Sequence, residues 1–91
     1  ASELKPQSPE PLAQLGWCEL ARRAPKAALS FFKRALLLNP RHGDSLYGLG
    51  YAYEQLTQPQ EARRYFERYL SLYPQGAKVR IIENKLKRLA P

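Results

Sequence analysis

The sequence is short of the residues that build disulfides, metal sites and membrane spans. Its 91 residues include one cysteine, one histidine and no methionine. A single cysteine excludes an internal disulfide, and one cysteine with one histidine excludes a zinc site built from these residues. No apolar run is long enough to cross a bilayer, so no membrane insertion is expected. The lone cysteine is compatible with a reducing compartment and only weakly favours a cytoplasmic location.

Acidic residues are also scarce. Eight Asp and Glu stand against 15 Lys and Arg, which gives a net charge of +7. Hydrophobic residues make up 44% and charged residues 25%, a balance typical of one folded globular domain at this length. The sequence has no charged segment followed by an apolar segment, so it shows no sign of a signal peptide. Because the chain begins with Ala1, we expect a processed chain or a fragment of a longer protein.

The sequence contains an internal repeat. A shift of 34 residues places Leu12 on Leu46, and the register continues without a gap until Pro40 falls on Pro74. The other identical pairs are Leu15 and Leu49, Gly16 and Gly50, Pro25 and Pro59, Ala28 and Ala62, Phe32 and Phe66, Arg34 and Arg68, Leu36 and Leu70, and Leu38 and Leu72. We therefore divide the chain into a flexible linker at 1–8, a first unit at 9–42, a second unit at 43–76 and a C-terminal segment at 77–91.

Each unit has the pattern of two antiparallel α-helices. Apolar and small residues recur every three or four positions, and each unit is broken in the middle by a turn that ends in proline, at 23–25 and 57–59. Gly16 and Gly50 lie inside the first helices, where glycine costs about 1 kcal/mol relative to alanine. We expect each glycine to face a small residue of its partner helix, Ala28 or Ala62, so that the two helices approach closely.

These features resemble the tetratricopeptide repeat family, whose 34-residue helix-turn-helix unit has a conserved order of apolar, Leu-Gly, aromatic, Ala, aromatic, Ala and Pro positions. The first unit supplies Leu12, Leu15, Gly16, Ala28, Phe32, Ala35 and Pro40, and the second supplies Leu46, Leu49, Gly50, Tyr53, Ala62, Phe66 and Pro74. Two positions depart from the pattern: Glu19 replaces an aromatic residue and Tyr69 replaces an alanine. The resemblance covers residues 9–76 and implies an all-α solenoid that binds other proteins.

The C-terminal segment is predicted to be one further helix, from Ala77 to Ala90. One stripe is apolar and consists of Val79, Ile82, Leu86 and Leu89. The side that a following helix would cover is polar and consists of Arg80, Glu83, Asn84 and Lys87. We therefore interpret the segment as a capping helix that ends the array of repeats.

No group of residues has the composition of an active site. His42 and Asp44 lie between the two units, where a helix-capping turn explains them. Cys18 occupies the position of Ala52 in the second unit and is interpreted as a small packing residue. The stretch 48–50 is expected to be helical and is not a phosphate loop. We expect no enzymatic activity, cofactor, metal site or small-molecule substrate.

By the resemblance, the first helix of each unit lines the concave side of the solenoid. The residues expected to bind a partner there are Trp17, Leu20, Tyr47, Tyr51, Lys78, Ile81, Lys85 and Arg88. Because the leucines at 12, 15, 46 and 49 are expected to form the core, the rings of Trp17, Tyr47 and Tyr51 are surplus to it. Aromatic side chains are frequent hot spots of binding. Packing on neighbouring side chains is the alternative explanation for these rings.

The function predicted from the sequence is protein–protein interaction. The partner segment would place an apolar or aromatic anchor in the concave groove and acidic residues beside Lys78, Lys85 and Arg88. An architectural or self-associating module is the first alternative, joined through an N-terminal edge that includes Cys18. Nucleic-acid binding through the basic C-terminal helix is the second, although Asp44 and other nearby carboxylates would oppose phosphate.

Overall fold

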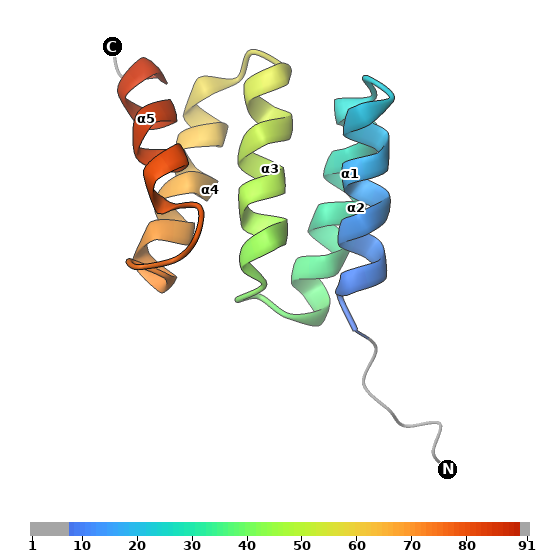
Figure 1. Ribbon diagram of the computed structural model, residues 1–91. Helices are drawn as coiled ribbons and strands as arrows, with labels where there is room; N and C mark the ends of the chain where they lie inside the picture. Colours follow the sequence, from blue (N-terminus) through green and yellow to red (C-terminus); the bar gives the residue numbers. More distant parts are fainter. Residues whose placement is uncertain (1–7, 90–91) are drawn as a thin grey trace.

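The computed structural model describes residues 8–89, and this part of the chain folds into five α-helices (Figure 1). They are α1 at Glu10–Ala21, α2 at Pro25–Leu38, α3 at Gly43–Gln55, α4 at Pro59–Leu72 and α5 at Val79–Leu89. Helices α1, α3 and α5 form one layer, and α2 and α4 form a second layer behind it. This is the predicted all-α repeat. Residues 1–7 of the predicted linker and Ala90, the predicted end of the last helix, lie outside the described residues.

The turns within the two units have the same geometry. Pro25 and Pro59 open α2 and α4, as predicted. Arg23 and Thr57, at equivalent positions of the repeat, both have positive φ angles, of 63° and 56°. Such a left-handed residue after a helix lets the following amide N–H reach back to the last carbonyls and reverses the chain direction. The repeat of this geometry explains why both helix pairs are antiparallel.

The core contains two phenylalanine rings that are held against glycines. Phe32 and Phe66 are fully buried. A Cβ atom added at Gly16 would lie 2.8 Å from the Phe32 ring, and one added at Gly50 would lie 2.4 Å from the Phe66 ring. The predicted close approach of the paired helices is therefore present. The ring itself, rather than a facing alanine, occupies the space over each glycine. Gly48 of α3 also contacts the Phe32 ring, from which an added Cβ would lie 2.4 Å away.

The buried side of α1 differs from the prediction. Leu15, expected in the core, is 45% exposed, whereas Ala13 is buried, and so is Leu20, which is expected on the concave surface. The reason is that α1 packs on α2 and also on α3 of the next unit. These two neighbours bury the stripe through Ala13, Gly16 and Leu20, and no helix of the described chain covers Leu15.

Helix α5 packs on α4 through its apolar stripe. Ile82 is fully buried, and Val79, Leu86 and Leu89 are partly buried against the core. The four residues predicted on its polar side, Arg80, Glu83, Asn84 and Lys87, are exposed. The helix begins at Val79, two residues after the predicted start at Ala77. None of the described helices combines the length and apolar character that a membrane span requires.

Candidate partner-binding surface

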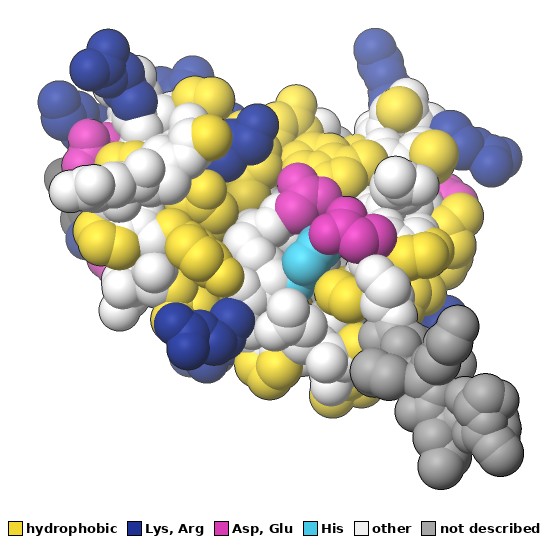
Figure 2. Space-filling view, turned by 60° about the horizontal axis from the view of Figure 1, so that its bottom comes forward, with side chains coloured by type: hydrophobic (Ala, Val, Ile, Leu, Met, Phe, Trp, Pro, Cys, Tyr) yellow, Lys and Arg dark blue, Asp and Glu magenta, His cyan; other side chains and the backbone are white. Residues whose placement is uncertain are grey.

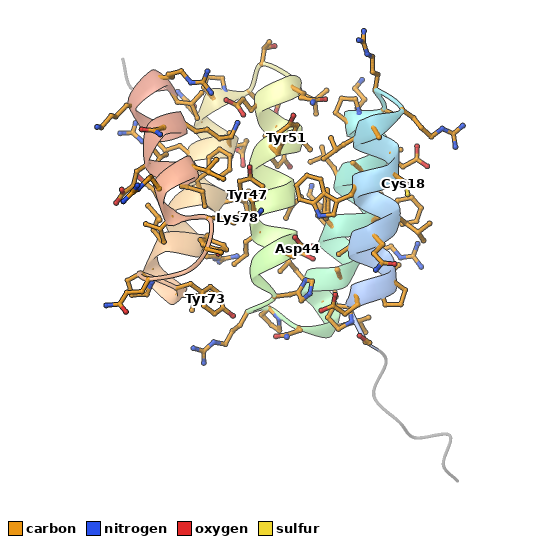
Figure 3. The ribbon with its side chains drawn as sticks, in the orientation of Figure 1. Cys18, Asp44, Tyr47, Tyr51, Tyr73 and Lys78 are labelled. Carbon is orange, nitrogen blue, oxygen red and sulfur yellow. The ribbon has the colours of Figure 1, made fainter. Side chains whose placement is uncertain are left out.

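The α1–α3–α5 layer, which corresponds to the predicted concave side, gathers three aromatic rings between α1 and α3. The Trp17 ring centroid lies 5.7 Å from that of Tyr47 and 5.9 Å from that of Tyr51. The two tyrosine centroids are 6.3 Å apart. Figure 3 shows both tyrosines on α3, with Lys78 beside Tyr47. The structure therefore brings together the three aromatic residues that were singled out from the sequence.

The Trp17 side chain is fixed in orientation. Its indole N–H donates a hydrogen bond of 3.0 Å to Oδ2 of Asp44 across the junction between the units. Its ring meets the Phe32 ring edge-on at 5.3 Å. The indole is half-buried, so one part of the ring serves the core and another part faces solvent. Packing therefore explains the buried part of this ring, and a binding role of its exposed part stays a prediction.

Two predicted site residues are not accessible. Tyr47 is only 8% exposed and packs against Phe66 as well as Trp17. Leu20 is buried too. The expectation that Tyr47 is surplus to the core is wrong because α3 is packed by the first unit on one side and by α4 on the other. Burial, followed by the nearby Tyr51 and Glu54 side chains, raises the pKa of Tyr47.

The cations of the predicted site differ in how freely they can meet a partner. Lys78 lies on the Tyr47 side of the surface, with its Nζ 5.2 Å from the ring centroid. The Arg88 side chain is well exposed, and its Nη2 lies 3.9 Å from Oε2 of Glu54. Ile81, on the same helix as Arg88, is 43% exposed. Ile81 and Arg88 are exposed and Lys78 is half-buried, and a contact of these residues with a partner stays a prediction.

Lys85, by contrast, is engaged within the domain. Its Nζ lies 2.8 Å from Oε1 of Glu54 and 4.8 Å from the centroid of the Tyr51 ring. The lysine side chain is only 12% exposed. The expected contact between Lys85 and acidic residues of a partner is therefore replaced by an ion pair that joins α5 to α3.

This ion pair has a measurable consequence. Lys85→Ala should reduce the free energy of unfolding by about 1–2 kcal/mol, because it leaves the partly buried Glu54 carboxylate with only the more distant Arg88 as a charged partner. The matched control is Lys87→Ala, the same change on the exposed side of the same helix, which should alter stability by less than about 0.5 kcal/mol. Urea denaturation of both variants measures the difference. Equal losses would show that the ion pair does not stabilise the α3–α5 contact.

Two hollows flank the aromatic cluster. The first, which we call the Trp17 pocket, has a volume of about 240 Å³ and is lined by Trp17, Leu20, Ala21, Tyr51 and Gln55. The second, which we call the Tyr73 pocket, has a volume of about 300 Å³ and is lined by Gly43, Asp44, Tyr69, Tyr73, Ala77 and Lys78. The Trp17 pocket is mostly apolar, and the Tyr73 pocket carries one charge of each sign. The sequence analysis did not identify the Tyr73 pocket, and the pair Tyr69 and Tyr73 at the end of α4 was the only signal for it.

His42 and Asp44 join α1 to α3 through their side chains, and the expected capping is not present, because no side-chain hydrogen bond caps α3 at His42. The His42 ring lies 2.7 Å from the Ser45 hydroxyl through Nδ1 and 3.1 Å from the Glu10 carboxylate through Nε2. Figure 2 shows the histidine beside two acidic side chains at this end of the molecule. Among residues 8–89, no group of three or more His, Cys, Asp or Glu side chains is placed to hold a metal ion.

Cys18 is exposed at the outer edge of α1, so its interpretation as a packing residue is wrong (Figure 3). Its repeat equivalent, Ala52, is fully buried. The difference arises because α3 is flanked by α2 of the preceding unit, whereas no described helix precedes α1.

Comparison with known proteins agrees with this architecture. The sequence pattern of the family described as "Tetratricopeptide repeat" matches residues 18–87. The chain is 33% identical over 63 residues to cellulose synthase operon protein C of Pseudomonas fluorescens (strain SBW25). That match covers 69% of this chain and 5% of the relative, so the chain spans a small part of the relative's length. Repeat register, helix pairing and the sequence match together show that the chain belongs to the tetratricopeptide repeat family.

Proposed function

We propose that this tetratricopeptide repeat domain binds a segment of a partner protein on its α1–α3–α5 face. Members of this family are protein-interaction or scaffold modules, which is the general role that family membership gives to this chain. The proposal adds the place and the chemistry of binding. An apolar or aromatic side chain of the partner would occupy the Trp17 pocket.

The observation that carries the proposal is the fixed aromatic wall of this pocket. Trp17 is held by its hydrogen bond to Asp44 and by the edge of Phe32. A ring that is already fixed loses little conformational freedom when a ligand packs against it, and this favours affinity. Large aromatic residues beside a pocket are also the side chains most often found as hot spots.

The charges around the pocket set the preferred sequence of the partner. Lys78 lies over the Tyr47 ring, and Arg88 is 70% exposed although it lies 3.9 Å from Glu54, so both can meet acidic residues, whereas Lys85 is held by Glu54 at 2.8 Å and is only 12% exposed. We therefore infer a partner with carboxylates near Lys78 and Arg88 and no requirement for a contact with Lys85. Such exposed charge pairs contribute little affinity and chiefly set orientation and association rate.

Filling the Trp17 pocket tests the proposal. Ala21 is an exposed residue that lines the pocket, so Ala21→Arg should block the pocket and leave the core intact. The test ligand is a peptide selected from a random library for binding to the unmodified domain. We expect Ala21→Arg to weaken the affinity for this peptide by about tenfold, since the arginine excludes a buried anchor side chain. The matched control is Ala27→Arg on α2, which is also exposed and lies outside the pocket.

Fluorescence titration can measure peptide binding to both variants. Trp17 is the only tryptophan in the chain, so its emission should change when the pocket is filled. Selected peptides that bind without altering this emission, or that bind the Ala21 and Ala27 variants equally, would place the binding surface elsewhere. A sedimentation coefficient that rises with concentration in the absence of peptide would favour the self-associating alternative, for which exposed Leu15 and Cys18 provide an apolar edge.

A further inference from the structure

A second groove lies in the other layer of the molecule, between α2 and α4. It has a volume of about 220 Å³ and is lined by Lys33, Leu36, Leu37, Pro40, Tyr65 and Arg68. Helices α2 and α4 form the rear layer in Figure 1, so this groove is separate from the aromatic cluster between α1 and α3. We call it the α2–α4 groove.

The α2–α4 groove has an apolar floor and an exposed apolar rim. Leu36 and Tyr65 are half-buried and form the floor. Leu37, at the rim, is 83% exposed, and it is the most exposed of the large hydrophobic side chains in residues 8–89. The core does not need Leu37, because Phe32 and Ala35 already bury α2. An exposed leucine continuous with an apolar floor is typical of a contact surface.

Two positive side chains line this groove. Lys33 and Arg68 flank the apolar floor, and neither forms an ion pair within the part of the chain that the structure describes. The neighbouring arginines of α4 do form ion pairs: Arg63 lies 3.4 Å from Glu67, and Arg64 lies 3.8 Å from Glu61.

Lys33 is held in its charged form. Its interaction with the Tyr53 side chain raises its pKa, and its Nζ lies 5.7 Å from the centroid of that ring. At neutral pH the groove therefore presents two positive charges, and neither is paired with a carboxylate among residues 8–89.

We propose that the α2–α4 groove binds an acidic segment of a partner protein, with one aliphatic or aromatic side chain against Leu36 and Leu37 and carboxylates beside Lys33 and Arg68. Charge complementarity selects the acidic partner, and the apolar floor selects a protein segment. Binding of this kind does not depend on the Trp17 pocket, so either surface can be occupied alone.

Two other occupants fit the groove less well. Single-stranded nucleic acid needs open ring faces for base stacking. Tyr65 is the only aromatic residue in the lining, and one of its faces is covered by Tyr53, stacked at 5.7 Å with an interplanar angle of 7°. A second copy of the chain carries the same net charge of +7, which opposes its approach to a positive groove.

The proposal can be tested by nuclear magnetic resonance on the ¹⁵N-labelled domain. The probe is a short synthetic peptide in which Leu and Phe alternate with Asp and Glu. Two control peptides of equal length replace either the acidic residues by Lys or the apolar residues by Ser, and an oligothymidine provides a nucleic-acid control. We expect only the first peptide to shift the amide signals of Leu36, Leu37 and Arg68. The proposal is overturned if that peptide leaves these signals unchanged at millimolar concentration, or if oligothymidine shifts them and the peptide does not.

Paired variants show whether the groove itself is responsible. The double variant Leu37→Ser and Arg68→Glu removes the exposed apolar rim and reverses one charge, and we expect about tenfold weaker binding. Both side chains are exposed, so the fold should be retained. The matched control, Leu15→Ser and Arg80→Glu, makes the same two changes at exposed positions on α1 and α5. Equal affinity of the two double variants would overturn the proposal. Shifts confined to residues around Trp17 would support the binding site on the other face and also overturn this one.

Discussion

Gly48→Ala should lower the free energy of unfolding by about 2–3 kcal/mol, although alanine favours helix more than glycine does. The added Cβ would lie 2.4 Å from Cζ of Phe32, far inside normal contact distance. The Phe32 ring is fully buried and has Gly16 close to its Cε1, so it cannot move aside freely. For a domain of this size, the melting temperature should fall by about 10 °C or more. Circular dichroism during heating measures the change.

A double-mutant cycle assigns the effect to the ring. Phe32→Leu alone should destabilise the domain, because it shortens a fully buried side chain. In the double variant the smaller leucine gives space to the new methyl group. The combined loss should therefore be smaller than the sum of the single losses by about 1 kcal/mol or more. Strict additivity would show that Gly48 and Phe32 do not determine the distance between the two units.

The helix pairs could be predicted because their signals are local. Proline at the first position of α2 and α4 and the regular apolar spacing within each helix depend only on neighbouring residues. Repetition of these signals after 34 residues made the repeat frame unambiguous. Gly16 and Gly50 were identified for the same reason, since both contact the ring of their own unit.

Contacts between units could not be predicted with the same success. Gly48 contacts Phe32 of the preceding unit, and nothing in its own unit indicates this. The same limit explains Cys18 and Ala52, which are equivalent in the repeat but differ in burial because only one of them has a preceding unit beside it. For α1, periodicity allowed two overlapping stripes, and the position of α3 decided that Ala13 rather than Leu15 is buried.

An ion pair in the candidate site could not be predicted from the sequence for a related reason. Lys85 was predicted to meet a partner because the repeat resemblance places it on the concave side, and no acidic residue lies three or four positions from it in the sequence. Its partner, Glu54, is 31 residues away, on α3. Only the relative register of α3 and α5 reveals this ion pair. The aromatic cluster was easier to predict, because Trp17 and Tyr51 hold equivalent positions in successive units.

Ile82→Asp should be the most damaging single change in α5, with a loss of about 4 kcal/mol, because it places a carboxylate in a fully buried apolar site. Ile82 is the only residue of α5 that is completely buried among the described residues, and its helix covers α4. If α5 acts as a cap, its release would expose the apolar side of the second unit. We therefore expect a lower melting temperature together with aggregation detectable by light scattering.

The adjacent residue supplies the control. Ile81 is 43% exposed, so Ile81→Asp makes the same chemical change one position away without burying a charge. Its cost should stay below about 1 kcal/mol, and the protein should remain monodisperse. The contrast between two neighbouring isoleucines separates loss of the cap from a general effect of negative charge on this basic helix. Equal destabilisation by the two changes would mean that α5 does not hold its position through the apolar stripe, and α4 would then have to be stable without it.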